Sequence, residues 1–343
     1  ALPDRPTRIE DSSGGIRQLT WSYLGLLTQY TDCSGHSTHY QYDADGRLTE
    51  TRSALDQRIR YHYDNAGRLV QLHRPDGEQQ YYQYDALGRL TRQEGPGQQH
   101  RSLRWAPHGL LLSEQDSSGR ELHYQYDQAG RLTRLTNENG AHSHFRYDEL
   151  DRLIEETGFD ERTQRYEYNA AGELTSQDDH GQQTSYEHDR VGRLVARHLP
   201  ATDCAPAQTE TFSWSRDGEL LSADNASQGI RIERHYSPLG QLSLESQQLG
   251  NDWVWQVSHQ YDERGRREQS QLGDAPPIHW HSYGPGHLLG LRAGPMALHF
   301  ARNALHQETR RELYSGSAGD SQLILQQQRQ YDALGRLEHS HLQ

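Results

Sequence analysis

Three pairs of histidines stand two residues apart, a spacing that could contribute two ligands to a metal ion. They are His142 and His144, His279 and His281, and His339 and His341. In a β-strand, residues i and i+2 lie on one face, so the imidazoles of each pair would point the same way. A metal site would still need a third ligand from another segment. Because a chain with 21 histidines forms such pairs easily, we predict no metal site.

Other kinds of chemistry are also poorly supported. All 35 basic residues are arginine, and without lysine the chain cannot form a Walker phosphate loop or a Schiff base. The segment from Asp43 to Gly46 faintly resembles a calcium loop, but Arg47 takes its fifth position and the closing glutamate is not at the required spacing. No nucleophile, base and orienting group are marked together. We therefore predict no catalytic residue, no cofactor and no enzyme activity.

Composition favours a thin-walled array of repeats over a disordered chain. The 343 residues carry a net charge of −13 and are only 32% hydrophobic, yet they include 20 tyrosines. Disordered chains of similar charge are usually poor in aromatic residues. A tyrosine can bury its ring while its hydroxyl stays in water, which suits a sheet exposed on both faces. The negative charge argues against a nucleic-acid partner, and no apolar run is long enough to span a membrane.

The elements that would position any site come from a repeat of 21 residues. Aromatic anchors recur at this interval, at Trp21, Tyr42, Tyr63, Tyr84, Trp105, Tyr126, Tyr147 and Tyr168. Leucine stands six residues after every anchor, and glycine stands four residues after it except at Asp151. Glycine also recurs seven residues before the anchor, with Asp56, Gln98 and Glu161 at the other places. A fixed period of this length indicates a repeat architecture.

Each repeat is predicted to be one β-hairpin, as residues 119–139 illustrate. Tyr124 and Tyr126 are two apart and would share one face of a strand. Asp127 and Gly130 then predict a type I turn closed by a left-handed residue. A second strand begins near Leu132, and another turn leads into the next unit. A lone hairpin is marginally stable, so we expect many to stack into one antiparallel sheet.

The array is predicted to be all-β and to run through residues 1–343 as a single domain. Regular units occupy about 14–181, and irregular units with longer loops occupy about 182–343. Prolines in the connecting segments, such as Pro200 and Pro206, mark the longer loops.

The phrase Y-D-x-x-G-R-L resembles the YD repeat of bacterial Rhs proteins, and related repeats occur in insecticidal toxin complexes and teneurins. Its predicted structural anchors are Tyr42, Asp43, Gly46, Leu48, Tyr63, Asp64, Gly67, Leu69, Tyr84, Asp85, Gly88, Leu90, Tyr126, Asp127, Gly130, Leu132, Tyr331, Asp332, Gly335 and Leu337. The resemblance implies a long, curved sheet that spirals into a hollow shell around a toxic C-terminal segment. It also implies export of a secreted effector made in the cytoplasm, in many cases by type VI secretion.

The resemblance further implies partners outside this sequence. They are the enclosed C-terminal toxin domain, the remaining shell and plug segments of the same polypeptide, and a secretion spike and a chaperone. The self-cleaving Asp-Pro-x-Gly motif of the family is not found before Gln343. The resemblance therefore implies only that this sequence is part of the shell wall, and we assign neither self-cleavage nor toxin chemistry to it.

An alternative is a carbohydrate-binding, adhesive surface of a cell-surface repeat protein. Tyrosine and tryptophan rings on an exposed sheet can stack against sugar rings. Trp253, Trp255 and Trp280 lie outside the repeat register, so they are the predicted contacts for such a ligand. The simpler interpretation is that the regular tyrosines pack neighbouring hairpins together.

Overall fold

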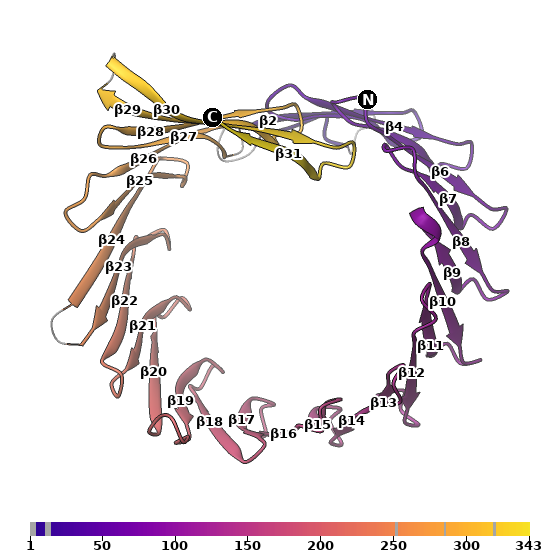
Figure 1. Cartoon of the computed structure of the whole chain (residues 1–343), viewed down its shortest axis with the longest axis horizontal. Coiled ribbons are helices and arrows are strands. Elements are labelled where there is room, and N and C mark those ends of the chain that lie inside the picture. Colours follow the sequence, from indigo (N-terminus) through magenta and orange to yellow (C-terminus); the bar gives the residue numbers. More distant parts are fainter. Residues whose placement is uncertain (1–4, 11–14, 251–252, 285, 318–319) are drawn as a thin grey trace. The chain divides into compact units, whose positions relative to one another are not determined.

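The computed structural model describes residues 5–10, 15–250, 253–284, 286–317 and 320–343. These residues form one sheet of 31 strands, all of whose described pairings are antiparallel. The prediction of an all-β repeat sheet is confirmed. Strands follow one another in chain order within each part of the chain (Figure 1). Residue 14, the predicted start of the regular repeats, lies outside the described residues.

The first ten strands are β1 Arg8–Glu10, β2 Ile16–Trp21, β3 Leu27–Thr31, β4 Ser37–Tyr42, β5 Leu48–Arg52, β6 Arg58–Tyr63, β7 Leu69–His73, β8 Gln79–Tyr84, β9 Leu90–Glu94 and β10 His100–Trp105. The next eleven are β11 Leu111–Asp116, β12 Glu121–Tyr126, β13 Leu132–Thr136, β14 His142–Tyr147, β15 Leu153–Thr157, β16 Thr163–Tyr168, β17 Leu174–Asp179, β18 Gln182–His188, β19 Leu194–Leu199, β20 Gln208–Trp214 and β21 Leu220–Asn225. The last ten are β22 Ile230–Tyr236, β23 Leu242–Leu249, β24 Trp253–Tyr261, β25 Arg267–Leu272, β26 Ile278–Tyr283, β27 His287–Ala293, β28 Met296–Arg302, β29 Glu308–Ser317, β30 Asp320–Tyr331 and β31 Leu337–Leu342. A single 3₁₀ turn, η1, spans Pro96–Gln98 within the described ranges.

The hairpin of β6 and β7 shows how one repeat folds. The backbone amide of Gly67 donates to the Asp64 carbonyl at 3.0 Å, and Gly67 has φ 78°. Glycine adopts this left-handed conformation at little cost, so the turn predicted from D-x-x-G is confirmed here. The strand register shifts between His62 and Tyr63, which places a bulge beside the turn.

The two faces of the sheet differ in chemistry. In β6, Ile59, Tyr61 and Tyr63 are half-buried, while the alternate residues Arg58, Arg60 and His62 are exposed. Tyr61 pairs with Leu72 and Tyr63 with Leu69 on the partner strand. One face is therefore aromatic and aliphatic, and the other is polar and charged.

The sheet has almost no closed core. Among the described residues, Leu103, Ala106, Ala196 and Phe300 are the buried apolar side chains, and no large side chain is fully buried. The predicted thin wall is thus what the structure shows. The stacking of neighbouring hairpins must provide most of the stabilisation, as in other repeat proteins.

The chain divides into two compact units. One contains the segment up to His100 together with the segment from His259 onward, and the other spans Arg101–Ser258. The assignment of residues 1–343 to a single domain stays a prediction. The described part of the chain contains no helix with the length and hydrophobicity needed to cross a bilayer.

Candidate functional site

A repeated pair of charged side chains occupies the turns in which arginine stands four residues after aspartate. In each pair the aspartate Oδ2 accepts a hydrogen bond from the arginine Nε at 2.7–2.8 Å. We call these pairs the Asp–Arg ladder; they are Asp43 with Arg47, Asp64 with Arg68, Asp85 with Arg89, Asp116 with Arg120, Asp127 with Arg131, Asp148 with Arg152, Asp189 with Arg193, Asp262 with Arg266, and Asp332 with Arg336.

The second oxygen of each ladder aspartate fixes the turn itself. In the Asp148 turn, Oδ1 accepts from the backbone amides of Leu150 at 2.9 Å and Arg152 at 3.0 Å. An aspartate that bonds backbone amides two and four residues on holds a tight turn in its folded shape. One carboxylate therefore both closes the turn and positions the arginine.

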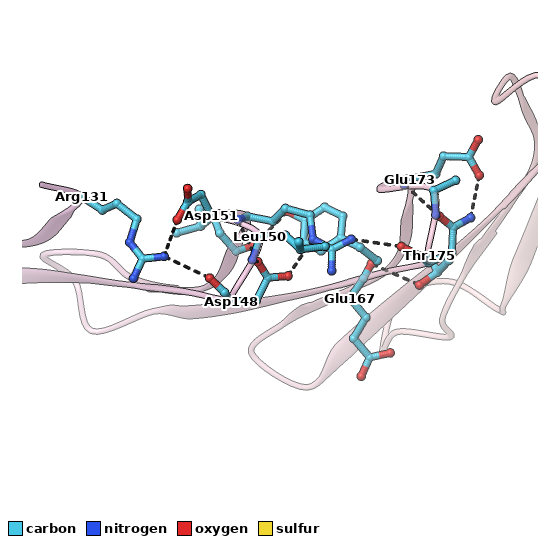
Figure 2. Close-up of polar contacts among 12 residues, drawn as sticks. Arg131, Asp148, Leu150, Asp151, Glu167, Glu173 and Thr175 are labelled. Atoms are coloured by element: carbon cyan, nitrogen blue, oxygen red, sulfur yellow. Dashed lines mark hydrogen bonds and ion pairs between the residues drawn. The ribbon is translucent and has the colours of Figure 1, made fainter. Parts of the chain in front are cut away.

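The arginine then reaches the next hairpin. Arg131 Nη1 donates to the Asp148 carbonyl at 3.0 Å and to Asp151 Oδ1 at 2.7 Å, as Figure 2 shows. Its guanidinium also lies 5.2 Å from the ring centroid of Tyr147, within cation–π range. Arg68 contacts the Asp85 carbonyl and the Tyr84 ring in the same way. Each such arginine links two consecutive repeats.

The anchor tyrosines link the repeats in the opposite direction. The hydroxyl of Tyr63 donates to the Leu48 carbonyl at 2.8 Å, and that of Tyr84 donates to the Leu69 carbonyl at 2.8 Å. The expectation that these hydroxyls stay in water is therefore wrong at these positions. Burial raises the pKa of Tyr84 above its usual value, which favours the neutral, donating phenol.

The ladder contacts also explain the acidity of its carboxylates. The hydrogen bond from the Arg152 backbone amide is the main cause that holds the pKa of Asp148 below its ordinary value. The Arg152 guanidinium lowers this pKa further, while partial burial opposes the shift. The ladder aspartates are therefore ionised at neutral pH, as the ion pairs require.

Where the aspartate is replaced, its partner four residues on changes too. Asn169 Nδ2 donates to the Glu173 carboxylate at 2.6 Å. Ser215 Oγ donates to the Glu219 carboxylate, also at 2.6 Å. Each pair still combines a donor with an acceptor, with the roles exchanged. These two turns thus keep a matched pair without aspartate, and the arginine's reach to the next hairpin is absent from both of them.

The three tryptophans proposed as ligand contacts occupy different settings. Trp253 is 51% exposed at the start of β24, whereas Trp255, two residues on, is half-buried. Trp280 lies in the unit that contains the segment from His259 onward. Its Nε1 donates to Ser270 Oγ at 3.2 Å. Its side chain lines a hollow with Tyr261, Arg266 and Leu288. Ligand binding at the three residues stays a prediction.

The histidine pairs behave as strand geometry requires. His142 and His144 lie on one side of β14 with ring centroids 6.0 Å apart. Within the described ranges, the three-residue group with suitable ligand geometry is instead Asp32, His36 and His306. His306 is 274 residues from Asp32, and no local spacing in the sequence signals this group.

Two protein-family models match the chain. Residues 9–158 match the teneurin YD-shell, and residues 168–203 match the RHS repeat. The chain is a YD-repeat protein of the Rhs type. The resemblance predicted from the Y-D-x-x-G-R-L phrase is confirmed, and the Asp–Arg ladder shows what the D and R of that phrase do.

Two bacterial toxins contain similar YD-repeat segments. The Tse5 toxin protein of Pseudomonas aeruginosa is 47% identical over 154 residues, which is 45% of this chain and 11% of that protein. The double-stranded DNA deaminase toxin A of Burkholderia cenocepacia is 39% identical over 80 residues, covering 23% of this chain and 6% of the toxin. This chain therefore spans a small part of the length of either relative.

One solved structure shares the fold over nearly the whole chain. It is the crystal structure of TcdB2-TccC3, with a TM-score of 0.54 and 13% sequence identity. The match covers 97% of this chain and 23% of that one. At this identity the likeness concerns the fold alone.

Proposed function

We propose that this chain is part of the wall of an Rhs shell that encloses a toxic C-terminal segment of the same polypeptide until delivery. The observation that carries the proposal is the double connection between consecutive hairpins. Backbone pairing joins them, and the arginine and tyrosine contacts join them again at the turns. Such a sheet is continuous yet thin, which suits a barrier better than a catalytic scaffold. The similarity to Tse5 supports the toxin context.

The wall would act sterically and electrostatically, without chemistry of its own. Its charged face carries cross-strand ion pairs, such as Arg60 with Glu50 at 2.8 Å and Arg165 with Glu155 at 2.8 Å. If this face lies toward the guest, its charged and polar side chains would offer an unfolded segment little apolar surface to which it could adhere. The proposal assigns no catalytic residue to the wall.

Delivery would use partners outside this sequence. We infer an exported bacterial effector, carried by a type VI secretion machine through its spike and a chaperone, with further shell and plug segments closing the container. The Rhs repeat character of the chain and its likeness to a Pseudomonas toxin support this route.

Limited proteolysis of the complete polypeptide tests enclosure. An unstructured tag at the N-terminus serves as the internal standard for an exposed segment. We expect the C-terminal segment to survive long after the tag has been cut. Equal rates of cleavage for the two would refute enclosure.

A matched pair of variants tests the wall itself. Replacing Arg68, Arg131 and Arg152 with alanine removes three links between consecutive hairpins. This variant should lose protection of the C-terminal segment. Arg92→Ala, which removes a side chain that bonds to Glu94 within its own strand, should retain it.

The adhesive alternative rests on one specific observation, the exposure of Trp253. A half-exposed indole on a sheet can stack on a sugar ring. Binding to a glycan array that disappears in Trp253→Ala, with the far-UV circular dichroism unchanged, would favour adhesion. No glycan binding by the parent chain would reject it.

A further inference from the structure

Two turns distant in sequence meet within the first unit. One joins β3 to β4 and contains Asp32 and His36; the other follows β28 and contains His306. His306 Nε2 lies 2.8 Å from Asp32 Oδ2, and the rings of His36 and His306 are 5.3 Å apart. Asp32, His36 and His306 each offer one ligand atom, and all three atoms lie within 4.8 Å of one another.

Asp32 directs its second carboxylate oxygen, Oδ2, at this group. Its Oδ1 is held by the backbone amides of Ser34 at 2.8 Å and His36 at 2.9 Å. The carboxylate is thus fixed in place, with Oδ2 directed at the two histidines.

His36 supplies an unused nitrogen. Its Nδ1 is buried from solvent and has no hydrogen-bond partner. This nitrogen lies 3.6 Å from Asp32 Oδ2, too far for a good hydrogen bond. A buried polar atom without a partner is rare in folded proteins and calls for an explanation.

The orientation of His306 is set by its backbone conformation and by two neighbouring residues. Its backbone adopts φ 60°, in the left-handed region. The Tyr283 hydroxyl lies 2.8 Å from its Nδ1, and the His287 ring stacks on it at 3.8 Å with the planes 9° apart. A histidine whose second nitrogen has a fixed partner has the arrangement usual for a metal ligand.

We propose that Asp32 Oδ2, His36 Nδ1 and His306 Nε2 bind a divalent metal ion of the zinc class. With bonds of about 2.0–2.1 Å, neighbouring ligand atoms of tetrahedral zinc are separated by about 3.3 Å. The oxygen–nitrogen separations of 2.8 and 3.6 Å lie on either side of this value. Two imidazoles and one carboxylate are a donor set that zinc accepts, with water as its fourth ligand.

Binding would replace the Asp32–His306 hydrogen bond with a bond from each residue to the metal. A neutral His306 bound through Nε2 carries its single ring proton on Nδ1, and from there it would donate to the Tyr283 oxygen. The metal would thereby join the turn at Asp32 to the turn at His306, two parts of the first unit separated by 274 residues.

The test measures zinc bound to the chain and to two variants. Each protein is loaded with zinc, dialysed and analysed for metal by mass spectrometry. His36→Ala removes a ligand but keeps the Asp32–His306 hydrogen bond, so it should fold. His142→Ala is the matched control, because it removes a histidine from a pair in the other unit.

We expect about one zinc ion per chain in the parent and in His142→Ala, and at least a tenfold loss in His36→Ala. Zinc should also raise the melting temperature of the parent but not that of His36→Ala. No retained zinc in the parent, or equal zinc in the parent and His36→Ala, would overturn the proposal. Neither outcome bears on enclosure, which the proteolysis of the complete polypeptide tests separately.

Discussion

Removal of a single tyrosine hydroxyl provides a sharp test of the links between repeats. Tyr84→Phe keeps the ring, and with it the contact with the Arg68 guanidinium 5.1 Å from the ring centroid. It removes the 2.8 Å hydrogen bond to the Leu69 carbonyl in the preceding hairpin. A hydrogen bond of this kind contributes about 1 kcal/mol net. The variant should lose about that much, equivalent to roughly a fivefold change in an opening equilibrium.

The same strand supplies the control. Tyr81 lies on the other face of β8, is 43% exposed, and bonds through its hydroxyl to the side chain of Gln79 in its own strand. Besides that bond within its own strand, Tyr81→Phe removes only a long, exposed contact of 3.4 Å from Gln71 Nε2 in the preceding hairpin. It should therefore change stability by less than about 0.5 kcal/mol, as is usual for surface substitutions.

Hydrogen exchange measures this effect locally. Amides of β7 and β8 should exchange about fivefold faster in Tyr84→Phe than in the parent, because exchange reports the free energy of local opening. In Tyr81→Phe their rates should stay close to the parental ones. If both variants exchange alike, the tyrosine hydroxyl does not link the repeats, and the reasoning from the 2.8 Å contact fails.

Three further predictions concern the turns. Gly88→Ala places a side chain at φ 82° with only ordinary contact to Arg68, so it should cost about 1 kcal/mol from backbone strain alone, measured by urea unfolding; an unchanged midpoint would contradict this. Asp148→Asn combined with Arg152→Glu rebuilds the donor–acceptor pair of Asn169 and Glu173. In a double-mutant cycle, the double variant should lose less free energy of unfolding than the two single variants lose in sum. Strict additivity would show that the two positions act independently. The pKa values of the ladder aspartates are lowered in the fold. Their contribution to the free energy of unfolding is therefore present above the unfolded pKa of about 3.9 and is lost as pH falls below it. The melting temperature should drop below about pH 4, and a flat profile from pH 5 to 2 would count against the ladder.

The sequence was sufficient to predict what a single hairpin needs. The D-x-x-G phrase predicts the turn because each residue type answers a local backbone requirement. Even the exceptions follow this logic, since Asp56, Gln98, Asp151 and Glu161 stand at glycine positions and all adopt φ of 59–64°. Aspartate tolerates this conformation better than β-branched residues do, and neither glutamine nor glutamate is β-branched.

The links between hairpins were harder to predict. The recurrent arginine after the turn glycine was visible, but its length lets it reach many partners. Only coordinates show that Arg131 contacts the Asp148 carbonyl and that Tyr63 contacts the Leu48 carbonyl. The period of 21 residues was the available signal. A side chain that recurs in every repeat can make the same contact with the adjacent repeat each time.

The Asp32–His36–His306 group depends on the folded array in a way that no local pattern reveals. In a flexible chain, bringing together residues separated by 274 positions costs about 5 kcal/mol of loop entropy, whereas one hydrogen bond returns about 1 kcal/mol. The contact between Asp32 and His306 therefore cannot form before the intervening hairpins are paired. Ordering those hairpins removes this cost, because their residues are already fixed by their neighbours. A metal that needs all three ligands would then bind the folded array and not the unfolded chain, and by linkage it would stabilise the array in proportion to the logarithm of the free metal concentration.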